Sequence, residues 1–399
     1  MNSFIEEISG RYAFEKKTIL SMCEKISGVS LADIAHSLDT STPRATRIVS
    51  EMVEAGFLTS IGKQESAGGR RPNLYCLNPA AGLFVGVDVD EDNISLAVTD
   101  FLGNVVYFGD STPYRLANTE ESIAGLCSTV DECLDAAGVD RSMVKAYGVS
   151  LTGRVNQLTG YSYSYFISEE KPIRTLLQKG FGKEVTIEND SCGMAYGEYK
   201  GAMKEDAGTI LFLNVSRGLG MGIVIDGKLF VGKSGFSGEI GHVPILDNNQ
   251  ICHCGKIGCL ETGASGRALK RILLERIRGG QPSLLSAACK GGKDISIEDI
   301  LEAVDKEDMA AIESIEEIGA VLGRAVAGLI NIFNPDMVII GGSLSVTERY
   351  LMPPLRSAVN RYSLNMVSSD TIIKVSRLGR KAGAIGASLL AKNRLLNNY

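Results

Sequence analysis

The sequence of 399 residues predicts two kinds of structure in succession: an N-terminal winged helix-turn-helix of the α+β class, then a longer α/β part. Three observations lead to this prediction. Residues 11–56 have helical periodicity and are followed by two strand-like segments, strands and helices alternate from about residue 83 onward, and one strand–turn–strand pattern occurs twice. A chain of this length suits two or three domains, each able to bury its own core.

Residues 11–38 predict two helices, the second beginning after Ser30 with Asp33 three residues on, which is typical of a capping box. A third helix is predicted with Thr42 as its N-cap and Pro43 at its first position, ending at Gly56. Its predicted buried face is Ala45, Ile48, Val49, Met52 and Val53. The strand-like segments 57–61 and 74–77 flank a Gly-rich, charged tip and predict the wing.

The α/β part repeats one pattern. Apolar segments 84–89 and 94–99 are followed by Asp100, and segments 210–215 and 222–225 by Asp226. Asp88 and Asp100 have the same spacing as Asn214 and Asp226, which predicts two similar lobes with a ligand cleft between them. We therefore expect three domains: 1–79, 80–197 and 198–399, with residues 78–82 as a linker and with a terminal helix that can pack on the first lobe.

The composition, 44% hydrophobic and 22% charged, is typical of a globular protein. The formal charge of −6 means that any DNA contact must be a local basic patch. The N-terminus does not resemble a signal peptide, and charges and a proline interrupt the most apolar region, 320–342. With nine cysteines and no secretion signal, we expect a cytoplasmic protein, with no membrane partner, whose thiols are reduced or bind metal.

The sequence predicts a metal site between residues 242 and 259. His242, Cys252, Cys254 and Cys259 lie within eighteen residues, and the intervening glycines allow a tight fold. Three thiols and one imidazole can complete a tetrahedral zinc shell, and four protein ligands make such a zinc structural. The alternative is a group of small buried thiols with a chance histidine. His253 is expected to be a bystander to the ion.

These segments also carry a resemblance. Residues 238–242 (GEIGH) and 252–261 (CHCGKIGCLE) resemble the signature of the ROK family, which comprises repressors, open reading frames and kinases. Further similar segments are 188–190 (END), 341–342 (GG) and 382–387 (AGAIGA), so the resemblance covers nearly the whole chain. The N-terminal part, with 69–72 (GRRP), resembles the repressor branch.

The resemblance implies an actin-like, two-lobed sugar-kinase fold. It also implies a sugar site to which this chain contributes Gly153, Arg154, Asn189, Asp190, Glu239, His242 and Glu261. Carboxylates and amides suit sugar hydroxyls because they can accept, or both donate and accept, paired hydrogen bonds. Asp190 matches the catalytic base of the kinase members. His242 would bind zinc through one ring nitrogen and offer the other to the ligand.

The chain departs from the kinases at both phosphate loops. Kinase members resemble Asp-x-Gly-Gly-Thr-Lys at the first loop, where this chain has 88–93 (DVDEDN), with carboxylates in place of glycines. The second loop, usually Gly-Thr-Gly, is 216–218 (SRG). Like charges facing a triphosphate repel it, so we expect no kinase activity.

The predicted third helix and wing carry residue types that contact bases and phosphates: Ser41, Thr42, Arg44, Thr46, Arg47, Arg70 and Arg71. The predicted partners are a double-stranded DNA operator and a sugar or sugar phosphate effector. A homodimer or homotetramer would read a palindromic operator.

The sequence thus favours a sugar-responsive transcriptional regulator, a repressor of carbohydrate-utilisation genes that contains structural zinc. The first alternative is an active sugar kinase with an appended DNA-binding domain. The second is a sugar-binding scaffold whose N-terminal module binds protein.

Overall fold

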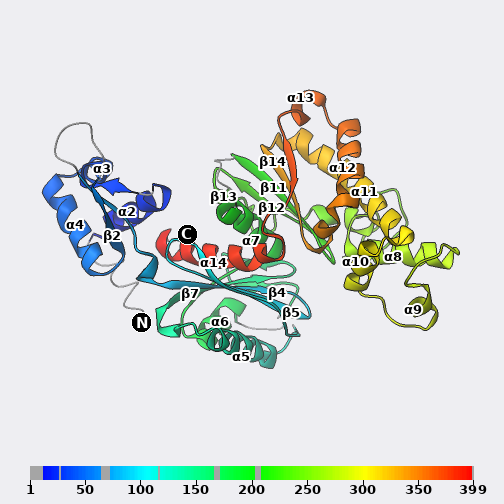
Figure 1. Cartoon of the computed structure of the whole chain (residues 1–399), viewed down its shortest axis with the longest axis horizontal. Helices are drawn as coiled ribbons and strands as arrows, with labels where there is room; N and C mark the ends of the chain where they lie inside the picture. Colours follow the sequence, from blue (N-terminus) through cyan, green and yellow to red (C-terminus); the bar gives the residue numbers. More distant parts are fainter. Residues whose placement is uncertain are drawn as a thin grey trace. The chain divides into compact units, whose positions relative to one another are not determined.

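The computed structural model describes residues 12–26, 28–63, 72–115, 117–165, 171–202 and 208–397. The chain divides into two compact units, one of Met1–Asp190 with Gly383–Tyr399 and the other of Ser191–Ala382. Figure 1 shows the elements of both. In the part of the chain described, no helix is both long enough and apolar enough to cross a membrane.

The first unit begins with a small helical module. Its helices are α2 (Ala13–Lys25), α3 (Leu31–Ser37) and α4 (Thr42–Glu54). An antiparallel sheet follows in the order β1-β3-β2, made of β1 (Val29–Ser30), β2 (Leu58–Lys63) and β3 (Asn73–Leu77). The predicted capping box at Ser30 and Asp33 is present, and it satisfies backbone N–H groups at the start of α3.

Two details of α4 differ from prediction. Ser41 is the N-cap, because its backbone is extended and its carbonyl accepts the first helical hydrogen bond, from Ala45 N–H at 3.0 Å. Thr42 is therefore the first helical residue. Val53 is 38% exposed and not part of the buried face. At 3.6 residues per turn, it lies roughly 90° around the helix from the centre of that face.

The segment predicted as a linker is a short 3₁₀ turn, η1 (Pro79–Ala81), bonded on both sides. Asn78 donates its backbone N–H to Phe57 O and its side-chain amide to Gly56 O, at 2.9 and 2.8 Å. Phe101 N–H donates to Pro79 O at 3.3 Å. The module is thereby tied to the strands that follow it.

A shared hydrophobic core joins the helical module to the first lobe. The rings of Phe57 and Phe101 have centroids 6.2 Å apart, and those of Phe84 and Phe101 are 6.0 Å apart. The same cluster includes buried residues of α2, α3 and α4 together with Ala391 and Leu396 of the C-terminal helix. Helical module and first lobe therefore form one packed body.

The first lobe has a five-stranded sheet in the order β10-β7-β4-β5-β6, in which β4 is parallel to β7 and antiparallel to β5. Its strands are β4 (Leu83–Val89), β5 (Asn93–Thr99), β6 (Val105–Pro113), β7 (Val144–Leu151) and β10 (Glu184–Asn189). Helices α5 (Glu120–Ala136) and α6 (Ile173–Phe181) lie on one face, and α14 (Ala382–Asn397) lies on the other (Figure 1). The shorter elements are η2 (Arg141–Met143), β8 (Val155–Asn156) and β9 (Tyr161–Ser162).

The second unit repeats this topology. Its sheet has the order β13-β12-β11-β14-β15, again with the central strand parallel to one neighbour and antiparallel to the other. The strands are β11 (Thr209–Val215), β12 (Leu219–Ile225), β13 (Lys228–Leu229), β14 (Met337–Gly341) and β15 (Ile372–Val375). The two predicted strand–turn–strand units are thus the equivalent strands of two similar lobes, which confirms the expected α/β fold class.

Helices cover both faces of the second sheet. Helix α7 (Asp190–Gly197) packs on one face, and α8, α10, α11 and α12 form a larger core on the other. These four are α8 (Gly266–Arg278), α10 (Ile297–Asp305), α11 (Met309–Phe333) and α12 (Glu348–Tyr362). The remaining elements are η3 (Glu198–Ala202), η4 (Ile240–His242), η5 (Leu260–Thr262), α9 (Ser286–Lys290), η6 (Ser343–Thr347), α13 (Asn365–Ser368) and η7 (Gly379–Lys381).

Two strand glycines let α14 lie directly on the first sheet. A Cβ on Gly86 would lie 1.9 Å from Ala384 O, and one on Gly148 would lie 1.9 Å from Ala387 O. Both obstacles are backbone atoms, which cannot rotate away as a side chain can. Any side chain at either position therefore has to displace α14 from the sheet.

We expect Gly148→Ala to lower the free energy of unfolding by about 1–3 kcal/mol, as overpacking of a core does. Gly125→Ala is the matched control, because no atom lies within 4 Å of the added Cβ and the position is inside helix α5. It should be neutral or slightly stabilising. Urea unfolding of both variants measures this, and equal midpoints would contradict the close packing of α14.

Candidate ligand, metal and DNA sites

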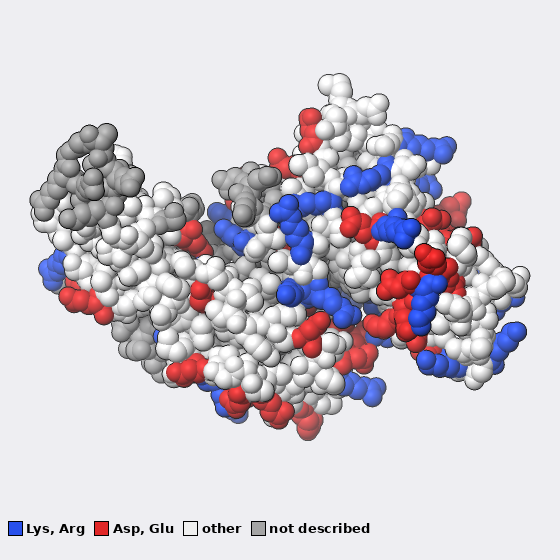
Figure 2. All heavy atoms as spheres, viewed as in Figure 1, with Lys and Arg blue, Asp and Glu red and all other residues white. Residues whose placement is uncertain are grey.

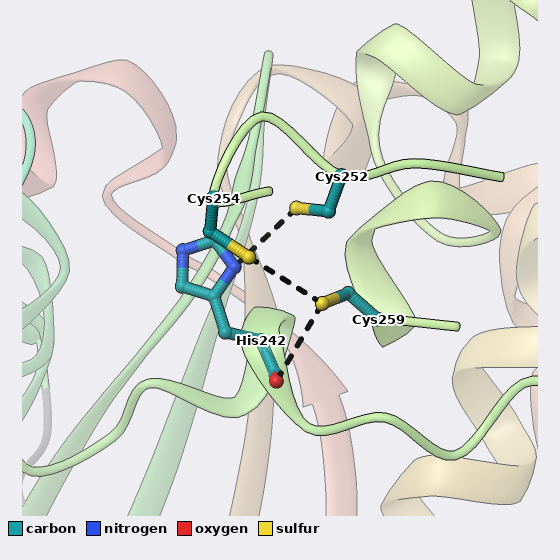
Figure 3. A group of neighbouring side chains, drawn as sticks. All are labelled: His242, Cys252, Cys254 and Cys259. Atoms are coloured by element: carbon teal, nitrogen blue, oxygen red, sulfur yellow. Dashed lines mark hydrogen bonds between the residues drawn. The ribbon is translucent and has the colours of Figure 1, made fainter. Parts of the chain in front are cut away.

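The four predicted metal ligands converge in the second unit (Figure 3). Their donor atoms lie within 4.8 Å of one another. Cys252 Sγ is 3.6 Å from His242 Nδ1, and Cys254 Sγ is 3.6 Å from Cys259 Sγ. The structure thus brings together the one histidine and three cysteines whose sequence spacing first suggested a metal.

Local backbone geometry builds this cluster. Bridges between Pro244 and Cys259 and between Ile251 and Ile257 fold the segment back on itself. Gly258 has a φ of +77°, and a Cβ there would lie 2.5 Å from Leu246 O. Only glycine meets both conditions, so Cys259 is brought under the loop that carries the other two thiols.

The three thiols differ in acidity. Burial raises the pKa of Cys252 to about 12, and burial followed by a hydrogen bond with Cys254 raises the pKa of Cys259. Burial also acts to raise the pKa of Cys254, but hydrogen bonds from the Lys256 N–H and the neighbouring thiols outweigh it and lower that pKa. A cation that binds thiolates would displace the protons that these buried groups otherwise retain.

Carboxylates adjoin the cluster within the second unit. Glu239 Oε2 is 3.8 Å from His242 Nε2, the ring nitrogen on the side away from the thiols. Glu261 is buried; its Oε2 accepts from Leu219 N–H at 3.0 Å, and its Oε1 is 2.8 Å from His253 Nδ1. His253, expected to be a bystander to the ion, therefore contacts a residue predicted to bind sugar, and the sequence pattern held no signal for that pairing.

The sugar-site residues predicted in the first unit also come together. The Asn189 side-chain amide donates to Gly153 O and to Asp190 Oδ1, both at 2.8 Å. Gly153 has a φ of +88°, and the next residue, Arg154, donates its N–H to Ser164 Oγ at 2.9 Å and has an exposed side chain. Asn189 thereby positions both the loop and the Asp190 carboxylate.

Three residues near this loop lie in register across adjacent strands of the first sheet: Asp88 of β4, Ser150 of β7 and Glu188 of β10. Burial, with the nearby carboxylates of Asp190 and Asp90, raises the pKa of Asp88 well above its usual value. Burial raises the pKa of Glu188 from 4.5 to about 7, although the Asn189 N–H and Arg394 act against it. Glu188 Oε2 and Ser150 Oγ have no hydrogen-bond partner among the residues that the structure describes.

The two segments predicted to replace the kinase phosphate loops, 88–93 and 216–218, hydrogen-bond within the protein itself. In the first, Asp90 N–H donates to Asn93 O and Glu91 N–H to Asp90 Oδ1. In the second, Ser216 N–H donates to Gly218 O, while Ser216 Oγ donates to Asn214 Oδ1 and accepts from Ser343 N–H. These N–H groups already have partners, which leaves fewer donors for a phosphate.

The predicted DNA-contacting residues of α4 are exposed: Ser41, Thr42, Arg44, Thr46 and Arg47. Ser50, which was not among the predicted contacts, is also exposed on this face. Arg70 and Arg71 lie outside the described residues.

The two arginines of α4 are paired within the module. Arg44 Nη2 lies 2.6 Å from Glu15 Oε1, with its guanidinium 5.2 Å from the centre of the Tyr12 ring. Arg47 Nε lies 3.4 Å from Glu51 Oε1. Such exposed pairs are weak, so phosphates can compete for these side chains.

Besides Glu15 and Glu51 of the helical module, acidic groups gather on the first lobe. Figure 2 shows them along one edge of the visible face, over α5. That helix carries Glu120 and Glu121 in its first turn, and its Asp131 and Asp135 pair with Arg141. The net charge of −6 therefore does not preclude a local basic face on α4.

A comparison with protein families decides the assignment: the model described as "ROK family" matches residues 84–394. The chain belongs to the ROK family. Among relatives of this ROK protein is the xylose repressor of Caldicellulosiruptor bescii, 28% identical over 387 residues, covering 96% of this chain and 95% of the repressor. The DNA-binding transcriptional dual regulator NagC of Escherichia coli K12 is 26% identical over 382 residues, covering 95% and 92%.

Solved structures of the ROK family are similar as well. A ROK family transcriptional regulator, described as a homolog of the E. coli MLC protein, has a TM-score of 0.75 and 28% identity, covering 92% of both chains. A ROK family glucokinase from Streptomyces griseus, in complex with glucose and AMPPNP, has a TM-score of 0.67 and 27% identity. It covers 78% of this chain and 100% of the kinase.

The raised pKa of Glu188 gives a pH prediction. Because its folded pKa lies above its unfolded value, the parent loses stability as the pH rises from 4.5 to about 7. A shift of that size corresponds to roughly 3 kcal/mol. We expect Glu188→Gln to unfold at a higher temperature than the parent at pH 8 and at nearly the same temperature at pH 5. If the melting temperatures of parent and variant differ by the same amount at pH 5 and at pH 8, the raised pKa of Glu188 is contradicted.

Proposed function

We propose that this ROK protein is a DNA-binding transcriptional regulator that responds to a sugar, a repressor of carbohydrate-utilisation genes released by a sugar or sugar phosphate. The observation that carries the proposal is a difference in coverage. The xylose repressor and the MLC homolog match more than nine-tenths of this chain, whereas the glucokinase matches 78% of it over the kinase's whole length. The family model begins at residue 84, after the helical module.

We assign DNA binding to residues 1–79, as a winged helix-turn-helix with α4 as the recognition helix. Helix α4 follows α3 after a short turn, buries Ala45, Ile48, Val49 and Met52, and exposes Thr, Ser and Arg side chains on the opposite face. That face suits the major groove, with Arg70 and Arg71 as wing contacts. Because one module offers few cations, we propose a homodimer or homotetramer on a palindromic operator.

We assign sugar contacts to Gly153, Arg154, Asn189 and Asp190, and to Glu239, His242 and Glu261. The support is the way these side chains are held. Asn189 fixes the Asp190 carboxylate, and a rigid carboxylate can accept two hydrogen bonds from neighbouring hydroxyls without loss of side-chain entropy. Glu261, with several protein contacts, contributes mainly a fixed charge.

We propose that His242, Cys252, Cys254 and Cys259 hold one structural Zn²⁺. Tetrahedral zinc, with Zn–S of about 2.3 Å and Zn–N of about 2.05 Å, places two sulfurs about 3.8 Å apart and sulfur and nitrogen about 3.6 Å apart. The observed separations of 3.6 Å for both pairs fit this donor set. Zinc on Nδ1 would leave Nε2 facing Glu239 and would orient the imidazole for the sugar.

We expect about one zinc per chain after purification without chelator, as four ligands imply. Cys254→Ser should lose zinc and weaken the response to sugar, since His242 loses its orientation. Cys289 is a free cysteine outside the cluster, so Cys289→Ser should keep both the zinc and the response to sugar. Metal analysis beside a thermal-shift assay measures this; full zinc content in Cys254→Ser would rule out the proposed ligand set.

An active sugar kinase with an appended DNA-binding domain is the second reading, favoured by the structural similarity to a glucokinase. It requires a triphosphate beside Asp88, Asp90 and Glu91, and the loop N–H groups there are already bonded. We therefore propose that the chain does not phosphorylate sugars. A coupled ADP assay with a bound sugar separates the two functions: turnover of about 1 per second would make the protein a kinase.

Two variants test the two parts of the proposed function separately: the response to sugar and the binding of operator DNA. Asp190→Ala should keep operator affinity but lose release by sugar, because Asp190 adjoins the sugar loop. Arg47→Ala should bind operator more weakly with unchanged sugar affinity. Fluorescence anisotropy with DNA from the region upstream of the protein's own gene measures both, at one salt concentration because phosphate contacts depend on salt. Sugar release retained by Asp190→Ala, or parental DNA affinity in Arg47→Ala, would show that the corresponding site is misassigned.

A further inference from the structure

Lys392 is a lysine whose side chain is only 2% exposed, in the C-terminal helix α14. Its ammonium lies 3.1 Å from Glu24 Oε1 of α2 and donates to Leu102 O at 3.1 Å. A buried ammonium costs several kcal/mol in desolvation unless it is paired and hydrogen-bonded. Lys392 meets that condition by joining three segments: the helical module, the turn after β5, and α14.

The turn that holds Leu102 is rigid. Asp100 Oδ1 accepts from the N–H groups of Leu102, Gly103 and Asn104, each at 2.9 Å, and Asp100 Oδ2 accepts from the Asn104 side chain. The carbonyl that binds Lys392 therefore has a fixed position on the first lobe. Any change in the placement of α14 must alter the distance from Lys392 to this carbonyl, to Glu24, or to both.

The start of α14 contacts Asp88 of β4, and its Lys392 end contacts the segment that follows the proposed sugar loop. Asp88 contacts the helix start so closely that a Cβ on Gly383 would lie 2.0 Å from Asp88 Oδ2. Farther along, Arg394 donates to Gln157 O at 3.3 Å, and Arg174 donates to the same carbonyl at 3.1 Å. Gln157 directly follows β8, the strand after the loop of Gly153 and Arg154.

Between these contacts α14 has little freedom to deform. Gly86 and Gly148 place the helix backbone directly on the sheet, with no side chain between them to absorb a displacement. From Gly383 to Lys392 the helix spans about 14 Å. A shift of the sugar loop at Gln157 therefore reaches α14 at Arg394, two residues from Lys392, whose buried ammonium pairs with the more exposed Glu24 of the DNA-binding module.

We infer that α14 couples the sugar loops to the DNA-binding module and that Lys392, through Glu24, is the residue that positions the module in response. This inference rests on the proposed function and adds its route of regulation. Coupling requires an element with two arrangements, one favoured by the sugar and the other by the operator. The contacts of Lys392 with Glu24 and Leu102 O are the ones whose geometry must differ between these two arrangements.

The test uses the full chain with the double substitution Glu24→Gln/Lys392→Met, because replacing both partners leaves no buried charge unpaired. Lys306→Met is the matched control: it removes a lysine from an exposed pair, with Glu302, in the second unit. The probes are upstream DNA and whichever of D-xylose, N-acetylglucosamine and N-acetylglucosamine 6-phosphate raises the melting temperature of the parent most.

In the parent and in Lys306→Met, sugar should weaken operator binding by roughly 5–150-fold. In the double variant, operator affinity without sugar and sugar affinity should each stay within about threefold of the parent, while the effect of sugar on the operator falls below about twofold. A merely structural pair would lower the melting temperature and leave the sugar effect intact, and that result would overturn the inference while leaving the proposed function standing.

Two further outcomes are decisive. If none of these sugars changes operator affinity in the parent, the proposed function fails and the coupling route fails with it. If the double variant does not fold, hydrogen exchange on the parent replaces it: sugar should change the protection of segments 382–397 and 13–25. Unchanged exchange in both segments at saturating sugar would overturn the inference.

Discussion

Backbone-to-backbone contact between α14 and the first sheet is the constraint from which the organisation of the first unit follows. Gly86 and Gly148 remove the side-chain layer that normally separates a helix from a sheet, so α14 lies where its start meets Asp88 and its last turns reach the helical module. Phe57, Phe101 and Phe84 extend the same core across the linker. The N-terminal module is therefore not a tethered domain but part of the packed body that carries the proposed sugar loops.

The second unit depends on a different local device. A short loop turned by the left-handed Gly255 and Gly258 brings Cys252, Cys254 and Cys259 together beside His242, with the four donor atoms within 4.8 Å of one another. The same loop carries His253 to Glu261, and His242 presents its outer nitrogen to Glu239. A metal-loaded loop can in this way hold two carboxylates and an imidazole in a fixed arrangement, which is what recognition of a polyhydroxylated ligand requires.

Periodicity predicted most of the fold, because helix and strand patterns reflect which face is buried: α3, α4, β4, β5, β11 and β12 were all predicted from it, and the repeated spacing predicted two similar lobes. The metal cluster was predictable because its ligands are close in sequence. The pairing of Lys392 with Glu24 was not, since the two residues are more than 360 positions apart and neither stands in a distinctive pattern. Nor could the sequence show that the predicted linker is bonded on both sides, or that Ser41 and not Thr42 caps α4, because these depend on tertiary contacts and on a single backbone angle.

The central claim is that sugar and operator bind to one protein and oppose each other. Linkage makes this reciprocal: the factor by which sugar weakens operator binding must equal the factor by which operator weakens sugar binding. Calorimetric titration of sugar into the free protein and into its operator complex, at the same salt concentration, measures the second factor directly. We expect the sugar to bind the complex roughly 5–150-fold more weakly than the free protein. Equal sugar affinity in the two titrations would contradict the account, whatever the structure of the two sites.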